Sequence, residues 1–571
     1  MSKLLNLPLS EYPRPQFERD SYLCLNGLWD YAIKKSDVFL DNFDGKILVP
    51  YSPESNLSGV KKQVYPDDFL HYHTVFNLED GFNKGRVFLN FGACDQVCKV
   101  YLNGVFVGMH EGGYNSFSFE ITNYLVDNDN NLYIIVTDDA NSDIYGRGKQ
   151  KYKRGGIWYT ATSGIWQTVW LESTPKNYIK NITFTPDIDD NLLHVCCDKV
   201  GDGPVNLNIL DDGETVKTCS FDNKISIDVT NFKLWSPENP NLYRVEVTFN
   251  DDIVRSYFGL RKFSIITLNG KKYFALNNKP YFNNGLLDQG YWVDGFYTPP
   301  SNKAMFDEIK SVKDLGFNML RKHIKVEPML WYYYCDLLGV LVWQDMINGG
   351  KQYPAWRIML APFINLKLDD TNSKKMGRTN ESYKQFLTES RQMHAQLYNT
   401  VSICLFTPYN ECWGQYKAQE VYDLFKLLDP SRLYDHASGW VDVGAGDLTS
   451  RHIYFRKAKI KNDGIRILAL TEFGGYSYSL KDHVFTSKKF GYKSFSNKDA
   501  LQKAYKKLFV NEIIPLILNE GLCATVYTQL SDVEDEVNGL FTYDRILKFD
   551  KDFLVKVNRL VYKTFEDSIK I

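Results

Sequence analysis

Short alternating runs of apolar and polar residues fill the first part of the chain. Between residues 12 and 171, runs such as 86–91 (RVFLNF) and 97–102 (VCKVYL) are separated by turn residues, and Asn103-Gly104 follows the second of these runs. Such alternation predicts β-strands with one buried face, and Asn-Gly between two runs predicts a tight hairpin. We therefore predict an antiparallel, jelly-roll-like β-sandwich for residues 1–174.

A second block of strand-like runs follows. It contains apolar runs at 179–185, 192–197, 205–210, 225–229 and 243–249. Runs of this number and spacing over about 90 residues are typical of an immunoglobulin-like β-sandwich. We predict this domain for residues 175–266.

The pattern changes after residue 267, where strand-like runs alternate with longer amphipathic segments. This alternation is typical of βα units around a parallel sheet. The eight candidate strands are residues 281–287, 317–323, 340–345, 401–410, 433–438, 450–454, 467–472 and 522–529. Eight βα units predict a (β/α)8 TIM barrel over residues 267–571, with its functional residues just after the strand ends. The expected fold class is multidomain, with two β-sandwiches followed by a barrel.

The composition of the chain argues against several classes of binding partner. The formal charge of the 571 residues is −2, which provides no basic surface for nucleic acid or for an anionic membrane. No apolar run is long enough to span a bilayer, and residues 1–14 lack the apolar stretch of a secretory signal, so we expect a cytoplasmic protein. The 10 cysteines show no metal-like spacing. We expect neither a cofactor nor a metal, and a homo-oligomer is compatible with the sequence.

Two glutamates follow strand-like runs of the predicted barrel. The run 401–406 leads into Asn410 and Glu411, and the run 467–470 leads into Thr471 and Glu472. In a TIM barrel both glutamates would stand at the same mouth. Two carboxylates across a cleft can cleave a glycosidic bond, because one can donate a proton to the leaving oxygen while the other attacks the anomeric carbon. The alternative for each glutamate alone is a helix cap or a surface ion pair.

Nearly the whole chain resembles glycoside hydrolase family 2, which includes β-galactosidases, β-glucuronidases and β-mannosidases. The matching segments are 25–29 (LNGLW), 163–167 (SGIWQ), 236–243 (SPENPNLY), 258–261 (FGLR), 318–323 (NMLRKH), 410–411 (NE) and 471–474 (TEFG). The resemblance implies that Glu411 is the acid/base, that Glu472 is the nucleophile, and that the reaction retains the anomeric configuration.

The chemistry of neighbouring residues agrees with these implied roles. A guanidinium keeps a nearby carboxylate ionised, so we expect Arg321 beside Glu472. Tyr454 is expected to donate a hydrogen bond to the same carboxylate, as the similar tyrosine does in the family. Asn410 is expected to bind the sugar hydroxyl next to the anomeric carbon, with a structural asparagine in a turn as the alternative. Three further candidates for substrate binding lie near the predicted mouth: His323, Asp288 and Trp413.

The loop after the last predicted strand bears on the identity of the sugar. The family's glucuronidases hold the sugar carboxylate with an Asn-x-Lys motif there, whereas residues 534–542 read EDEVNGLFT, which is acidic and has no lysine. We therefore expect a neutral sugar. The sequence favours a retaining exo-β-glycosidase that hydrolyses a terminal β-galactoside by double displacement, with β-mannoside, β-glucoside or β-glucuronide as alternatives. A transglycosidase and a catalytically silent carbohydrate-binding protein remain open.

Overall fold

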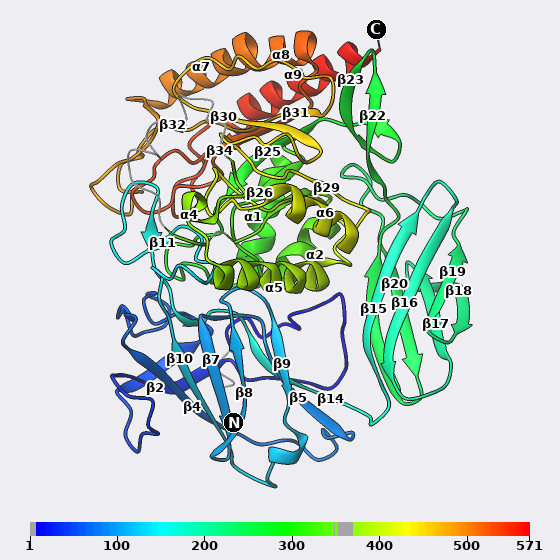
Figure 1. Ribbon diagram of the computed structural model, residues 1–571, viewed down its shortest axis with the longest axis vertical. Coiled ribbons are helices and arrows are strands. Elements are labelled where there is room, and N and C mark those ends of the chain that lie inside the picture. Colours follow the sequence, from blue (N-terminus) through cyan, green and yellow to red (C-terminus); the bar gives the residue numbers. More distant parts are fainter. Residues whose placement is uncertain (1–6, 348, 352–368, 571) are drawn as a thin grey trace.

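The computed structural model describes residues 7–347, 349–351 and 369–570, and their sheets fall into three groups (Figure 1). The first two groups are β-sandwiches and the third is a barrel of parallel strands with helices around it. The predicted fold class is therefore confirmed. In Figure 1 the first sandwich lies below the barrel, and the second sandwich lies beside both. Among the described residues, no helix combines the length and the apolarity needed to cross a membrane.

Two antiparallel sheets form the first sandwich. The alternation seen in the sequence is reproduced in β7 (Val97–Leu102), in which every second residue is buried. The Asn103-Gly104 hairpin is confirmed, because β7 pairs with β8 (Val105–Glu111) across it and both turn residues have positive φ. The four-stranded sheet has the order β1 (Tyr22–Cys24), β14 (Val169–Thr174), β5 (Arg86–Phe91) and β9 (Phe117–Glu120), and the six-stranded sheet has the order β3 (Gly45–Val49), β2 (Gly27–Lys34), β4 (Phe69–Phe76), β10 (Asn130–Thr137), β7 and β8.

The long connection from β10 to β14 leaves the first sandwich and reaches the barrel. It contains β11 (Gln150–Lys151), β12 (Tyr159–Thr160) and β13 (Gly164–Ile165), the last of which pairs with β6 (Cys94–Asp95). Arg154 in this connection forms an ion pair with Asp535 of the barrel at 2.9 Å. The first sandwich therefore contributes residues to the mouth of the barrel.

Seven strands in two sheets form the second sandwich, around a separate apolar core. One sheet has the order β15 (Tyr178–Asp187), β16 (Leu192–Val200) and β19 (Lys224–Asp228), and the other has the order β18 (Glu214–Phe221), β17 (Val205–Asp211), β20 (Tyr243–Phe249) and β21 (Asp252–Phe258). A three-stranded sheet then leads to the barrel, formed by β22 (Phe263–Leu268), β23 (Lys271–Leu276) and β24 (Lys279–Pro280). The expected boundary at residue 266 falls within β22.

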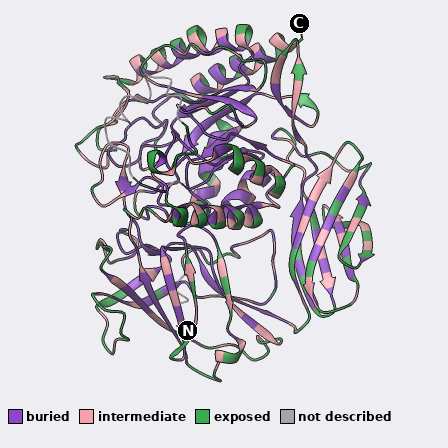
Figure 2. Cartoon of the chain, viewed as in Figure 1, coloured by how far each residue is buried: buried purple, intermediate pink, exposed green. Residues whose placement is uncertain are grey.

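Eight parallel strands form the barrel, and each coincides with one of the eight predicted runs. Their order is β29 (Leu433–Tyr434), β28 (Ile403–Thr407), β27 (Leu341–Asp345), β26 (Met319–Lys322), β25 (Asn283–Asp288), β34 (Ala524–Thr528), β31 (Ile467–Gly474) and β30 (Leu448–Ile453). Side chains help to join the two ends of this order, because the Ser438 hydroxyl after β29 lies 2.8 Å from Nε2 of His452 in β30. Figure 2 shows these strands as buried in the centre of the barrel.

Helices cover most of the outside of the barrel. They are α1 (Asn302–Asp314), α2 (Met329–Leu338), α4 (Ser373–Met376), α5 (Asn380–Leu397), α6 (Ala418–Leu428), α7 (Lys498–Leu508), the π-helical segment η3 (Phe509–Ile513), α8 (Ile514–Glu520) and α9 (Lys551–Ile569). Residues 435–447 and 454–466 are described in full and contain no helix, so the βα alternation is interrupted after β29 and β30. Helix α5 faces the first sandwich, where Asn115 Nδ2 donates a hydrogen bond to the Glu389 carbonyl at 3.1 Å.

Candidate active site

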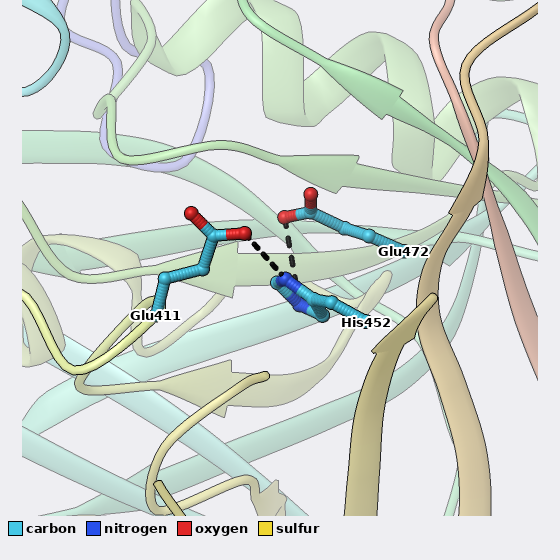
Figure 3. A group of neighbouring side chains, drawn as sticks. All are labelled: Glu411, His452 and Glu472. Carbon is cyan, nitrogen blue, oxygen red and sulfur yellow. Dashed lines mark hydrogen bonds and ion pairs between the residues drawn. The ribbon is translucent and has the colours of Figure 1, made fainter. Parts of the chain in front are cut away.

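The strand ends bring the two predicted acidic residues together. Glu411 follows β28, and Glu472 lies within β31. Because the barrel strands are parallel, their carboxyl ends share one mouth. One carboxylate oxygen of Glu411 and one of Glu472 are no more than 4.8 Å apart. Figure 3 shows the two carboxyl groups beside the ring of His452, which is linked to both.

The backbone around Glu411 adopts an unusual conformation. Glu411 and Cys412 have φ angles of 50° and 61°, in a region that costs a non-glycine residue about 1–3 kcal/mol. Two hydrogen bonds support this turn: Glu411 N donates to the Ser438 carbonyl at 2.7 Å, and Ser438 N donates to the Tyr409 carbonyl at 2.8 Å. The turn thus fixes the Glu411 side chain against the neighbouring strand end.

Donors surround the carboxylate of Glu472. Arg321 Nη1 donates to Oε1 of Glu472 at 3.1 Å, and the Tyr454 hydroxyl donates to Oε2. Arg321 is completely buried and also forms a two-pronged ion pair with Asp345, at 3.0 and 2.9 Å. The ring of Tyr492 stacks on Tyr454 with 3.8 Å between centroids. These contacts hold Glu472 in one orientation and favour its ionised form.

The two glutamates have different electrostatic surroundings. Burial raises the pKa of Glu411 to about 7, although the positive charges of Lys149 and Arg321 act in the opposite direction. Burial also raises the pKa of Glu472, but there the ionised form is favoured by the Arg321 guanidinium and by the Tyr454 hydroxyl. Repulsion between two close carboxylates opposes ionisation of both. Donors that favour ionisation therefore surround Glu472, whereas burial is the largest influence on Glu411.

His452 lies in this site, although the sequence analysis did not single it out. Its Nδ1 lies 2.8 Å from Oε1 of Glu411, and its Nε2 lies 3.6 Å from Oε1 of Glu472. The available signal was its position two residues before Tyr454 in a strand-like run, because residues i and i+2 of a strand point to the same face.

Two of the other candidates, Asn410 and His323, also lie beside the glutamate pair. Arg321 Nη2 donates to Oδ1 of Asn410 at 2.9 Å, which orients the Asn410 amide. His323 Nε2 lies 3.7 Å from Oε1 of Glu472, while its Nδ1 bonds to Gln289 at 2.9 Å. Burial lowers the pKa of His323 well below its ordinary value, so the ring is neutral.

Asp288 and Trp413 have other neighbours. Both carboxylate oxygens of Asp288 are engaged, one by Lys322 Nζ at 2.6 Å and one by the Gly290 amide at 2.8 Å. The structure thus places Asp288 in a buried ion cluster and does not bring it to the glutamate pair. Trp413 follows the Glu411 turn and stacks on Trp158 of the first sandwich, with 4.7 Å between ring centroids. That stack joins the two domains at the mouth.

Lys149, also absent from the sequence analysis, comes from the first sandwich. It is 8% exposed, and its charge lowers the pKa of Glu411 and of His452. Within the described part of the chain, no residue forms a hydrogen bond or an ion pair with its amine, and the Tyr159 ring centroid lies 5.5 Å away. No sequence pattern identifies such a residue, because the connection from β10 to β14 contains several other basic residues.

Glu411, His452 and Glu472 each offer one atom within 4.8 Å of the others, an arrangement that resembles a metal-binding group. The guanidinium of Arg321 already occupies this position, since Nη1 lies 3.1 Å from Glu472 Oε1 and 3.4 Å from His452 Nε2. A metal ion here would face a fixed positive charge. The donor set therefore does not fit a metal.

Two family models match the first part of the chain. The description "Glycosyl hydrolases family 2, sugar binding domain" matches residues 60–175, and "Glycosyl hydrolases family 2" matches residues 177–261. Residues 60–175 and 177–261 thus match domains of glycosyl hydrolase family 2. The resemblance seen in the sequence is thereby confirmed.

The names of curated relatives differ in the sugar. A putative β-glucuronidase of Formosa agariphila is 27% identical over 429 residues, which cover 64% of this chain and 49% of the relative. A β-galactosidase of Lactococcus lactis is 27% identical over 417 residues, which cover 70% of this chain and 37% of the relative. The matched region thus spans half or less of these two relatives.

Solved structures reproduce the whole architecture. A β-glucuronidase of Ruminococcus gnavus has a TM-score of 0.76 at 17% identity, covering 98% of this chain and 100% of that one. A β-D-glucuronidase of Dictyoglomus thermophilum has a TM-score of 0.75 at 19% identity, covering 96% and 98%. At these identities the likeness shows a shared fold, barrel included, and leaves the sugar open.

Proposed function

We propose that this chain is a retaining exo-β-glycosidase that hydrolyses a terminal, neutral, β-linked sugar. The observation that carries the proposal is the spacing of Glu411 and Glu472, which have carboxylate oxygens within 4.8 Å of each other. Retaining glycosidases hold these carboxyl groups about 5–5.5 Å apart, whereas inverting ones leave a wider gap for a water molecule. The spacing supports retention by double displacement.

The two glutamates have different roles in the proposed reaction. In the first step the Glu472 carboxylate attacks the anomeric carbon while Glu411 transfers its proton to the glycosidic oxygen, and the aglycone leaves as an alcohol. In the second step Glu411, now ionised, takes a proton from water while the water oxygen attacks the anomeric carbon. The sugar is released, and Glu472 is again a carboxylate.

A third carboxylate at the mouth, Glu536, supports a neutral sugar. Its negative charge contributes to the raised pKa of Glu411, after the larger effect of burial. Its partners are the Tyr159 hydroxyl and the Asn538 amide, and no cation among the described residues pairs with it. The carboxylate of a uronic acid bound here would be repelled by this negative charge. We place β-galactosides first because several curated relatives, including that of Lactococcus lactis, have that name.

A β-uronide is the second candidate, favoured by Lys149. Lys149 is 8% exposed, its charge acts on Glu411, and it has no ion-pair partner among the described residues, so its amine could hold a sugar carboxylate. Lys149→Met separates the two candidates. It should leave the KM for a neutral β-galactoside nearly unchanged, whereas it should raise the KM of a β-uronide by about tenfold or more, the loss of one charged hydrogen bond.

A panel of aryl β-glycosides tests the proposal, with galactoside, mannoside, glucoside, glucuronide and galacturonide as members. We expect turnover of the galactoside and its loss in Glu472→Gln. Glu389→Gln is the matched control, since Glu389 is also buried but lies on α5 at the first sandwich. Inactivity on every sugar, with sugar binding intact, would overturn the proposed enzymatic function and would support a carbohydrate-binding protein.

A further inference from the structure

His452 directly contacts the proposed acid/base. Nδ1 of His452 lies 2.8 Å from Oε1 of Glu411, and the His452 side chain is completely buried. The ring comes from β30, and Tyr454 follows directly after this strand, so one short segment contacts both glutamates. Figure 3 shows Oε1 of Glu411 directed at the ring and the other carboxylate oxygen directed away from it.

The neighbours of Nε2 determine which ring nitrogen carries the proton. Burial lowers the pKa of His452 to about 3, so the ring is neutral and has one N–H. Nε2 faces Nη1 of Arg321 at 3.4 Å, and a guanidinium can only donate. The Ser438 hydroxyl, 2.8 Å from Nε2, can donate as well. Nε2 is therefore the acceptor, and the N–H is on Nδ1.

We propose that His452 is a positioning residue for the acid/base: Nδ1–H donates to Oε1 of Glu411 and so assigns Oε2 as the atom that carries and delivers the catalytic proton. The kinetic part of this inference rests on the proposed function, whereas the hydrogen bond and the tautomer do not.

The proposed bond affects both chemical steps. A donor to Oε1 stabilises the ionised form that Glu411 reaches after it has protonated the leaving group. The other charges that face Glu411 come from separate elements: Lys149 from the first sandwich, Arg321 from β26, Glu472 from β31 and Glu536 from the loop after β34. Loss of the Nδ1–H donor should therefore raise the pKa of Glu411 while these charges stay in place.

Three variants distinguish the contributions of the two ring nitrogens of His452. His452→Asn keeps an amide N–H near the place of Nδ1, His452→Gln puts the amide near the place of Nε2, and His452→Leu has neither. His394→Gln is the control, because His394 is a buried neutral histidine on α5, away from the glutamates. Melting temperatures of all four identify any variant that fails to fold.

The kinetic readout is the dependence on the leaving group. Departure of phenol needs the acid, whereas departure of 2,4-dinitrophenol does not. General-acid catalysis contributes about 10²–10⁴-fold, so we expect His452→Leu to lower kcat/KM for phenyl glycosides by about tenfold more than for dinitrophenyl glycosides. The alkaline limb of its pH profile should move to higher pH. His452→Asn should restore both the kcat/KM for phenyl glycosides and the position of the alkaline limb, whereas His452→Gln should restore neither. Equal losses for both leaving groups, with an unmoved alkaline limb, would overturn the proposal.

Nitrogen-15 NMR of the histidine rings tests the same bond without turnover. The chain has 9 histidines, and His452→Asn assigns the signal. We expect a neutral ring protonated on Nδ1 at pH 7, with its Nδ1 shift altered by Glu411→Gln. A ring protonated on Nε2 would overturn the proposal. A protein that turns over no glycoside but shows the Nδ1–H signal would refute only the proposed function.

Discussion

Arg321 Nη1 donates to Oε1 of Glu472 at 3.1 Å, while Nε and Nη2 of the same guanidinium bind Asp345 at 3.0 and 2.9 Å. One completely buried cation thus serves two buried carboxylates. Asp345 fixes the plane of the guanidinium, and the remaining N–H groups are directed at Glu472 and Asn410. The orientation of the proposed nucleophile therefore depends on a strand-end aspartate that does not touch it.

Removal of Arg321 should affect both stability and the acidic limb of the pH profile. Arg321→Met leaves two buried carboxylates without their cation, and breaking a buried pair in this way costs about 3–5 kcal/mol of the free energy of unfolding. It also raises the pKa of Glu472, so the nucleophile becomes ionised only at higher pH and the acidic limb of kcat/KM moves upward. Urea unfolding and a pH–rate series measure the two effects. An unmoved acidic limb in a folded variant would contradict the role of Arg321.

The alkaline limb should report on Glu411. Its pKa of about 7 predicts that kcat/KM falls as pH rises through about 7, because the acid loses its proton. Lys149→Met removes a positive charge that favours ionisation, so the pKa should rise and the limb should move to higher pH. Exposed Lys153 lies in the same connection, and Lys153→Met should leave the limb in place. Identical shifts in both variants would show that the effect is not local to Lys149.

The stack of Trp158 on Trp413 joins the two domains at the mouth, so its loss should disturb substrate binding there more than the chemical step. An aromatic pair contributes about 0.5–1.5 kcal/mol, which limits this disturbance to roughly a 2- to 10-fold change. We expect Trp158→Ala to raise KM within that range and to change kcat little, whereas Trp158→Phe should keep most of the affinity. Steady-state kinetics on one aryl glycoside decides this. A fall in kcat alone would place Trp158 in the chemical step instead.

Asp288 should matter for stability. It shares Lys322 with Glu327 in a cluster with almost no exposed surface, where the Lys322 amine lies 2.6 Å from Asp288 and 2.7 Å from Glu327. Asp288→Asn weakens a buried ion pair, so the free energy of unfolding should fall by about 3 kcal/mol. Exposed Asp294 provides the control, and Asp294→Asn should cost little. A large increase in KM with unchanged stability would instead support the substrate-binding role expected from the sequence.

The sequence predicted the barrel strands well because their signal is local. Each run is apolar and bounded by turn residues; Glu411 follows β28, and β31 contains Glu472. His452 was read only as part of a strand, because its role depends on contacts with two other strands.

Residues that the first sandwich contributes to the mouth of the barrel also could not be predicted from sequence patterns. Lys149 and Trp158 belong to the first sandwich, and their place at the barrel mouth depends on how two domains dock. Asp288 is the converse case. Its position after a strand is typical of a site residue, yet Lys322 from the next strand takes up its charge. Pairing between neighbouring strands decides such cases, and one sequence does not contain that information.

The anomeric configuration of the first-formed sugar tests the central claim most directly. Proton NMR of an aryl β-galactoside reaction, recorded before mutarotation, distinguishes the two anomers of the released sugar. Double displacement through Glu472 predicts that the β-anomer appears first and then equilibrates. Initial release of the α-anomer would mean that water attacks directly, and it would contradict the assignment of Glu472 as the nucleophile.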